Sequence, residues 1–184
     1  MSHSPIYGRH SRQRVMSEEL GPEWQSLFSS FDRTPIASAS IGQVHRATLN
    51  TGETVAVKIQ FPGIKESISS DLGNLSILLR SSALLPPGLY LQNTIAVMSR
   101  ELEDECDYIR EGESGSRFGE MLKGDDFFVV PRVFEQATRG RVLTSEWMGG
   151  KPLSRMQGMS QATRDKVCNG FTWGYEAFHK GSAG

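Results

Sequence analysis

A lysine and a run of small residues are spaced so that they could bind a phosphate chain. Lys58 ends the segment Val-Ala-Val-Lys, and residues 37–42 before it read Ala-Ser-Ala-Ser-Ile-Gly. Small side chains let a backbone loop approach a polyphosphate with its N–H groups facing the oxygens, and a lysine on the next strand adds a positive charge. A plain hairpin with a small-residue turn and a surface lysine would give the same pattern, so both interpretations stay open at this point.

The segment that carries these residues predicts two strands and a turn. Residues 44–49 are rich in strand formers, and residues 50–53 (Asn-Thr-Gly-Glu) supply a turn with its glycine. Residues 54–59 then alternate polar or small residues with apolar ones, which is the period of a half-buried strand.

This hairpin matches the nucleotide-covering hairpin of protein kinases, whose signature is G-x-G-x-x-G-x-V followed by V-A-I-K. Gly42 takes the third glycine, Val44 the valine and Lys58 the lysine. Ala37 and Ala39 replace the first two glycines. Because a Cβ penalises positive φ, the alanines predict a stiffer loop that is set differently over the phosphates.

Helical segments are predicted on both sides of the hairpin. Residues 1–15 predict a disordered tail without a clear transit-peptide signal. A short helix is predicted after Gly21-Pro22, with an apolar face formed by Trp24, Leu27, Phe28 and Phe31. Helical spacing also runs over residues 64–85, 91–122 and about 160–179.

The helix predicted over residues 91–122 has a strongly acidic side. A solvated helix face would account for these charges. A kinase-like site also requires one glutamate that pairs with the nucleotide lysine, and Glu111 is the best candidate. Glu111 lies far along the chain from Lys58, so the helix over residues 64–85 would be part of an inserted helical hairpin.

Two further segments complete the predicted sheet. Residues 127–134 (FFVVPRVF) predict an apolar strand that Pro131 bends or confines to an edge. Residues 141–150 predict a strand that ends in Glu, an aromatic residue, an apolar residue and two glycines, which is similar to a kinase hinge. By that match Ser145 is the gatekeeper, and the backbone of residues 146–148 contacts adenine. A generic transition from strand to loop would look the same.

Composition excludes several classes of protein. A chain of 184 residues with 38% hydrophobic residues suits one soluble globular domain, or one and part of another. The net charge of −1 gives no sign of nucleic-acid binding. Cys106 and Cys168 form neither a disulfide framework nor a metal-binding spacing, which favours a reducing compartment. The uncharged stretch between Arg80 and Arg100 is broken by Pro86-Pro87-Gly88, so no transmembrane span is predicted.

The motifs together resemble the UbiB/ADCK family of atypical kinase-like proteins, which is associated with coenzyme Q (ubiquinone) biosynthesis. The resemblance covers residues 16–178 and is closest to the mitochondrial, eukaryotic branch. The matching stretches are LGPEW (20–24), PIASASIGQVHRA (35–47), VAVKIQFPGI (55–64), SDLGNL (70–75), ELEDECDYIRE (101–111), FFVVPRV (127–133) and VLTSEWMGGKPL (142–153).

The resemblance implies an α+β fold, namely a kinase-like N-lobe with an antiparallel sheet and inserted helices, followed by a hinge and the first helices of a C-lobe. The implied division is a tail over residues 1–15, the N-lobe over 16–148 and the start of a truncated C-lobe over 149–184. Lys58 and Glu111 are then the catalytic ion pair, and Glu105 and Asp107 stand at the family's Glu-x-Asp motif. The implied nucleotide-binding residues are Ala37, Ser38, Ala39, Ser40, Gly42, Val44, Ala56, Lys58, Ser145, Glu146, Trp147 and Met148.

The resemblance also implies an ATP- or ADP-dependent kinase or ATPase that supports ubiquinone biosynthesis on the matrix side of the mitochondrial inner membrane. Ubiquinone-biosynthesis proteins and inner-membrane lipid would be its partners. Two family features are absent from the sequence: the Lys-x-Gly-Gln motif in residues 1–35, and the catalytic-loop and Asp-Phe-Gly acids after residue 179 that hold Mg²⁺ in the full-length family. We therefore expect no metal ligands here and a catalytically incomplete fragment. The alternatives are a non-catalytic nucleotide-binding or scaffold remnant and a small-molecule phosphotransferase of the aminoglycoside-kinase type, which the SIGQVH loop argues against.

Overall fold

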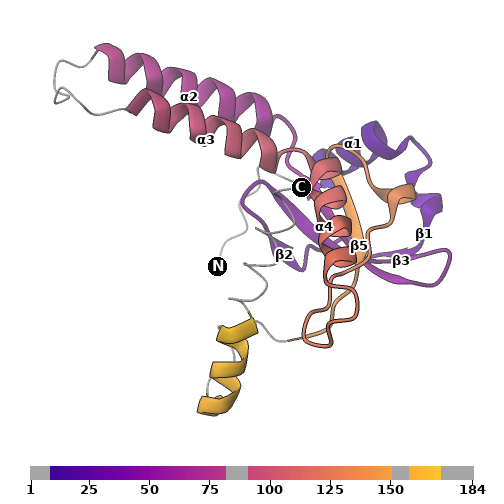
Figure 1. Cartoon of the computed structure of the whole chain (residues 1–184). Coiled ribbons are helices and arrows are strands. Elements are labelled where there is room, and N and C mark those ends of the chain that lie inside the picture. Colours follow the sequence, from indigo (N-terminus) through magenta and orange to yellow (C-terminus); the bar gives the residue numbers. More distant parts are fainter. Residues whose placement is uncertain (1–8, 82–90, 151–157, 171–184) are drawn as a thin grey trace.

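The computed structural model describes residues 9–81, 91–150 and 158–170. A small antiparallel sheet and several helices form an α+β fold, as predicted (Figure 1). The elements in chain order are α1 (Arg9–Leu20), the 3-10 helix η2 (Trp24–Leu27), β1 (Phe28–Phe31), β2 (Ala37–Ser38), β3 (Gly42–Leu49), β4 (Thr54–Gln60), α2 (Ile64–Ser81), α3 (Leu91–Glu105), α4 (Tyr108–Met121), the 3-10 helix η3 (Glu135–Ala137) and β5 (Val142–Glu146). Residues 161–170 form a further helix.

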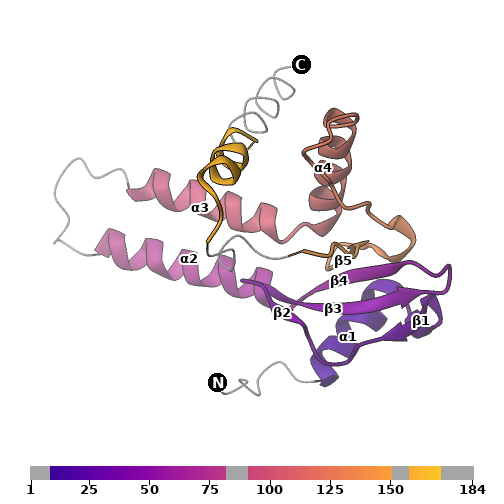
Figure 2. The same cartoon turned by 90° about the horizontal axis from the view of Figure 1, so that it is seen from below.

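The sheet has the strand order β1-β3-β4-β5, and the short β2 also pairs with β3. Every second residue along β4 faces the core, and Val55, Val57 and Ile59 are buried there. Val15 and Met16 of α1, both with no exposed surface, pack into the same cluster. Helix α1 therefore covers one face of the sheet, and α4 lies on the other face (Figure 2).

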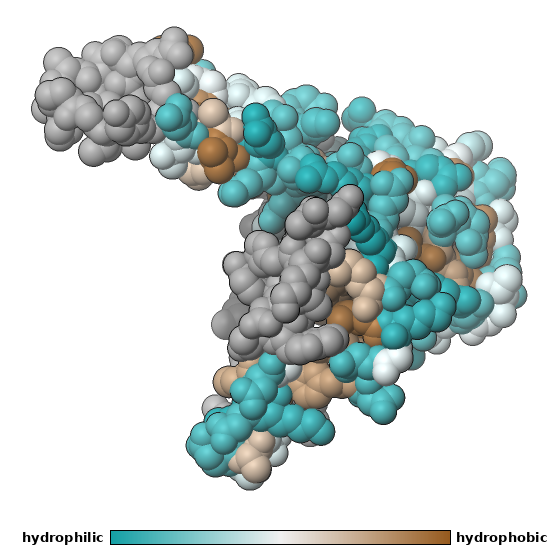
Figure 3. Space-filling view, viewed as in Figure 1, coloured by the Kyte–Doolittle hydropathy of each residue, from teal (hydrophilic) through white to brown (hydrophobic). Residues whose placement is uncertain are grey.

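Helices α2 and α3 form an antiparallel hairpin that projects from the body of the domain (Figures 1 and 2). Several apolar side chains on this hairpin are exposed, among them Ile77 (66%), Leu78 (65%) and Val97 (55%). Figure 3 shows apolar residues on the hairpin scattered among hydrophilic ones. In the described ranges, no helix has both the length and the apolar character that crossing a membrane requires.

The hairpin of β3 and β4 and the strand β5 confirm the predictions for those segments, and α2 begins at the predicted residue 64. The predicted tail is wrong for residues 9–15, which belong to α1. Helix α1 forms here because Val15 and Met16 pack against the sheet. This is a tertiary contact, which the local sequence pattern does not predict. The remaining domain boundaries stay predictions, and residues 151–157 and 171–184 lie outside the described part.

The helix predicted after Gly21-Pro22 is wrong. One 3-10 turn is followed there by strand β1, which pairs with β3. The three aromatic residues of the predicted helical face instead form a cluster, in which the ring centroids of Trp24 and Phe31 lie 5.2 Å apart and those of Phe28 and Phe31 lie 5.4 Å apart.

The single helix predicted over residues 91–122 is also wrong, because the chain breaks between α3 and α4 at Cys106 and Asp107. Asp107 has extended dihedral angles, and its carboxylate accepts a hydrogen bond of 3.1 Å from the N–H of Arg110. Asp107 is therefore the N-cap of a new helix.

The strand predicted over residues 127–134 is absent. An isolated bridge joins Val133 to Ser145 of β5, and the rest of the segment has no regular secondary structure. Pro131 lacks the N–H that a continuous ladder needs, which limits the pairing to the end of the segment.

Candidate functional site

The strand register gathers predicted site residues on the face of the sheet away from α1. Val44 lies opposite Lys58 in the β3–β4 pair, and Ala56 lies opposite Ser145 in the β4–β5 pair. Opposite residues of an antiparallel pair share a face, and so do residues two positions apart. These four side chains therefore share one face.

Lys58 and Glu111 form the ion pair that the sequence predicts. The Lys58 Nζ atom lies 2.8 Å and 2.7 Å from the two carboxylate oxygens of Glu111. Glu111 stands in the first turn of α4, where the helix dipole favours a negative charge. The pair is partly open to solvent, with 26% of the lysine side chain and 43% of the glutamate side chain exposed, so the ammonium can be reached by a ligand. The role of this pair toward a nucleotide stays a prediction.

The alanine-rich loop is held against β3 by backbone hydrogen bonds. Ala37 pairs with Val44 and Ser38 pairs with Gln43. The N–H of Ala39 donates to the carbonyl of Gly42 at 2.9 Å. The loop is therefore a hairpin closed by backbone hydrogen bonds, and the Ala39 N–H is used in one of them. The stiffness that the alanines predict stays a prediction.

Gly42 occupies a position with no room for a side chain. A Cβ at this residue would lie 2.4 Å from the backbone carbonyl oxygen of Ile59 and 3.1 Å from the hydroxyl of Tyr108. The glycine is thus required by the close approach of two backbones at the start of β3.

A cavity of about 480 Å³ opens beside the ion pair. It is lined by Ser40, Lys58, Asp104, Glu105, Arg110, Glu111 and Ser114. Arg110 also forms an ion pair with Asp104. The hydroxyls and the two cations can bind phosphate oxygens, whereas the three carboxylates repel a bare anion. This set of side chains therefore fits the phosphates of a nucleotide best when a cation accompanies them.

The two residues of the predicted Glu-x-Asp motif have different surroundings. Glu105 lines the cavity, whereas Asp107 caps α4. Within the described ranges, no group of three or more His, Cys, Asp or Glu side chains is arranged to hold a metal ion.

The predicted hinge is partly engaged within the fold. The N–H of Glu146 donates to the carbonyl of Arg132 at 2.8 Å, and the N–H of Trp147 donates to the carbonyl of Thr54 at 3.0 Å. Met148 has an N–H without a partner in the described part of the chain. The hinge residues do not line the 480 Å³ cavity.

Sequence reasoning missed the contacts that hold the start of α4 in place. The N–H of Tyr108 donates to the carbonyl of Gly140 at 3.1 Å. The side-chain amide of Gln60 donates to the carbonyl of Cys106 at 3.1 Å, and the N–H of Gln60 donates to the carbonyl of Arg141 at 3.0 Å. These bonds join the break between α3 and α4 to β4 and to the turn before β5. An Asp followed by apolar residues was the one local signal for that break.

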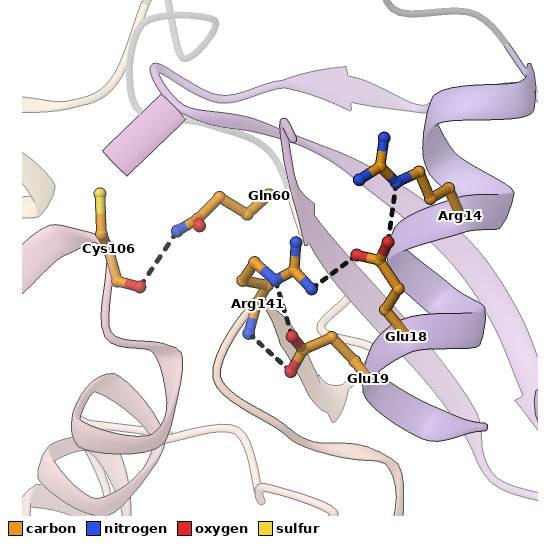
Figure 4. A network of polar contacts seen from close by, with 6 residues as sticks. All are labelled: Arg14, Glu18, Glu19, Gln60, Cys106 and Arg141. Carbon is orange, nitrogen blue, oxygen red and sulfur yellow. Dashed lines mark hydrogen bonds and ion pairs between the residues drawn. The ribbon is translucent and has the colours of Figure 1, made fainter. Parts of the chain in front are cut away.

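Arg141 joins the same turn to α1 (Figure 4). Its Nε lies 2.6 Å from Glu19 and its Nη2 lies 2.9 Å from Glu18, and Glu18 also pairs with Arg14 at 2.7 Å. Glu19 has a side chain that is only 16% exposed, and Arg141 is a cation that compensates its carboxylate there.

Replacement of Arg141 by methionine should lower the free energy of unfolding by about 1–2 kcal/mol, because Glu19 loses a charged hydrogen-bond donor in a half-buried position. Urea unfolding measures this loss. Arg14→Met is the matched control: Arg14 pairs with Glu18 but is 72% exposed, and its loss should cost less than about 0.5 kcal/mol. Equal losses in the two variants would contradict the role given to Arg141.

The same network predicts an acid dependence. Hydrogen bonds from Arg14 and then Arg141 hold the pKa of Glu18 below its ordinary value. A lowered carboxylate pKa adds stability above the pKa of the unfolded chain, and this stability is lost as pH falls through the folded value. The Arg141→Met variant should therefore lose less stability than the wild type does between neutral pH and acid.

Comparison with known proteins places this geometry in a family. The family model of the ABC1 atypical kinase-like domain matches residues 2–176. "Atypical kinase COQ8B, mitochondrial" of Danio rerio is 46% identical over 155 residues, which are 84% of this chain and 25% of that protein. "Atypical kinase COQ8, mitochondrial" of Saccharomyces cerevisiae is 48% identical over 155 residues, which are 84% of this chain and 31% of that protein. The chain thus spans about a quarter to a third of the length of these relatives.

A solved structure shows the same fold. The complex of Rv3197 with erythromycin from Mycobacterium tuberculosis has a TM-score of 0.74 and 34% sequence identity, and the match covers 86% of this chain and 40% of that one. The kinase-like fold is therefore found in a solved relative as well as expected from the motifs. Because the family model covers nearly all of the sequence, the chain belongs to the ABC1 atypical kinase-like domain family, as its resemblance to UbiB/ADCK proteins predicts.

Proposed function

We propose that this chain is the nucleotide-binding part of an atypical kinase or ATPase that supports ubiquinone biosynthesis. The relatives named COQ8 are atypical kinases by their names, and they are named mitochondrial, which supports a mitochondrial location for this chain. Ubiquinone-biosynthesis proteins and inner-membrane lipid remain the predicted partners.

The observation that carries the proposal is the Lys58–Glu111 pair on the wall of the 480 Å³ cavity. In a kinase site such a glutamate holds the lysine ammonium where it meets the phosphates. ATP or ADP would place its phosphates beside Lys58, with Ser40 and Arg110 as further donors. The bound nucleotide would supply the phosphoryl group, and Mg²⁺ carried by its phosphates would offset the repulsion between them and the carboxylates that line the cavity. The adenine would lie against Ala56 and Ser145 and accept a hydrogen bond from Met148.

A thermal-shift titration tests this proposal. ATP and ADP, with and without Mg²⁺, should stabilise the wild-type chain, since ligand at about 100 times its dissociation constant adds about 2.7 kcal/mol. Lys58→Ala should abolish most of the shift. Lys123→Ala is the matched control, because Lys123 also pairs with a glutamate of α4 but stands 77% exposed on the surface and does not line the cavity. Equal shifts in all three proteins would contradict a site at Lys58. The absence of any shift in the wild type would favour the non-catalytic scaffold instead.

A further inference from the structure

Tyr108 is fully buried where α4 begins, beside the Lys58–Glu111 pair. Its side chain has no exposed surface and packs with Ile41 and Leu143 in a small buried cluster. Leu143 lies opposite Lys58 in the β4–β5 register. The tyrosine therefore contacts both the end of the alanine-rich loop and the strand beside the nucleotide lysine.

The ring of Tyr108 also faces the ammonium of Lys58. The Lys58 Nζ atom lies 4.5 Å from the ring centroid, well within the range of a cation–π contact. Glu111 lies three residues after Tyr108 on α4, so the two side chains are neighbours on one side of the helix. The first turn of α4 thus holds the ammonium from two directions, with an aromatic face and with a carboxylate.

The hydroxyl of Tyr108 points to the loop. A Cβ on Gly42 would lie 3.1 Å from this oxygen. The hydroxyl is buried and has no hydrogen-bond partner in the described part of the chain. Burial, and next the charge of Glu111, raise the pKa of Tyr108, so the phenol stays neutral over the physiological range. The contact with the loop is therefore one of packing.

We propose that Tyr108 is a positioning residue through which α4 sets both Lys58 and the 37–42 loop against the nucleotide. The inference deepens the proposed function and rests on it. A shift of α4 would move the ring, the carboxylate of Glu111 and the support beneath Gly42 together. The ammonium and the loop would then leave their positions as one unit, and the affinity for phosphates would fall without any change in the residues that touch them.

A double-mutant cycle on ADP affinity tests the coupling. Tyr108→Leu removes the aromatic face and should weaken ADP binding by roughly three- to tenfold. In a Lys58→Ala background the same substitution should have almost no further effect, because the aromatic face acts through the ammonium and the leucine still packs against Ile41 at the end of the loop. Adenosine has no phosphate, so its affinity should stay within about twofold of the wild-type value in each variant. Additive losses in the cycle would overturn the proposal.

Two further variants separate positioning from general damage. Tyr108→Phe keeps the ring and should retain ADP affinity within about twofold, because it removes a hydroxyl that makes no hydrogen bond. Val55→Ala creates a cavity on the α1 side of β4, the strand that carries Lys58, and should lower stability without lowering ADP affinity. The ring is not the positioning element if Tyr108→Phe weakens ADP binding as much as Tyr108→Leu does. The same conclusion follows if Val55→Ala weakens ADP binding to that extent.

Proton NMR of the ligand-free protein tests the contact without any nucleotide. The side-chain methylene protons of Lys58, assigned by their loss in Lys58→Ala, should be shifted upfield by the ring in the wild type and in Tyr108→Phe, and should return to ordinary values in Tyr108→Leu. Unshifted protons in the wild type would overturn the positioning role. If the protons are shifted but ADP does not bind, the proposed function fails, and the role of Tyr108 toward a nucleotide fails with it. The contact between the ring and Lys58 would still be established.

Discussion

Trp24→Ala should lower the free energy of unfolding by about 3–5 kcal/mol, the range for truncation of a large buried aromatic residue. Trp24 is 6% exposed and belongs to the main core cluster. Its ring meets Phe31 and Phe28 edge-on, with centroids 5.2 Å and 6.2 Å apart, and such pairs add to the energy of burial. The neighbours cannot easily fill the space, because β1 is fixed to β3 by its register with Leu49 and Ala47.

Gln25→Ala is the matched control for this variant, because Gln25 is the next residue of the same 3-10 turn and is exposed. It should change stability by less than about 0.5 kcal/mol. Differential scanning calorimetry of both variants measures the difference. A loss below about 1 kcal/mol in Trp24→Ala would show that the aromatic cluster is not part of the cooperative core.

Gly42→Ala should lower the free energy of unfolding by about 2–3 kcal/mol, at the upper end of the range for overpacking. The atom that an alanine Cβ would meet first, 2.4 Å away, is the backbone oxygen of Ile59. A backbone atom in a paired strand cannot rotate aside as a side chain can, so β3 and β4 would have to separate at this point. The loop before Gly42 and the hydroxyl of Tyr108, 3.1 Å from the same Cβ, would be displaced as well.

Gly73→Ala provides the matched control for Gly42→Ala. Gly73 lies inside α2, and a Cβ there would meet nothing within 4 Å. Alanine should therefore raise stability by about 0.5–1 kcal/mol through its helix propensity. Opposite signs in urea unfolding are the expected result. Two variants that change stability in the same direction would contradict the close backbone approach at Gly42.

The sequence was informative where a clear local pattern or a kinase-like motif specifies the structure. The β3–β4 hairpin has strand periodicity on both sides of a turn that contains Gly52, whose positive φ of 100° suits glycine. The Lys58–Glu111 pair was predictable because a kinase-like site demands one glutamate for its lysine. The Cβ atoms that replace glycine predict a stiffer alanine-rich loop, which stays a prediction.

Features that depend on distant residues and carry no family motif were not predictable from the sequence. Strand β1 fits a helical pattern as well as a strand pattern, and only its pairing with β3 decides between them. The break at Asp107 lies within a continuous acidic stretch of good helical spacing, and bonds from Gln60 and to Gly140 fix it. No sequence pattern singled out Tyr108, and its place beside Lys58 follows from the break.

The order of strands in the sheet bears on how the chain is made in the cell. Strand β4 ends at Gln60, whereas its neighbour β5 begins at Val142, after both helices of the projecting hairpin. During synthesis at roughly 5–20 residues per second, the outer edge of β4 waits on the order of ten seconds for its partner. An unpaired strand edge that carries Val55, Val57 and Ile59 is a template for pairing with other chains. The nascent protein therefore passes through a period of vulnerability to aggregation, which ends when β5 leaves the ribosome and closes the sheet.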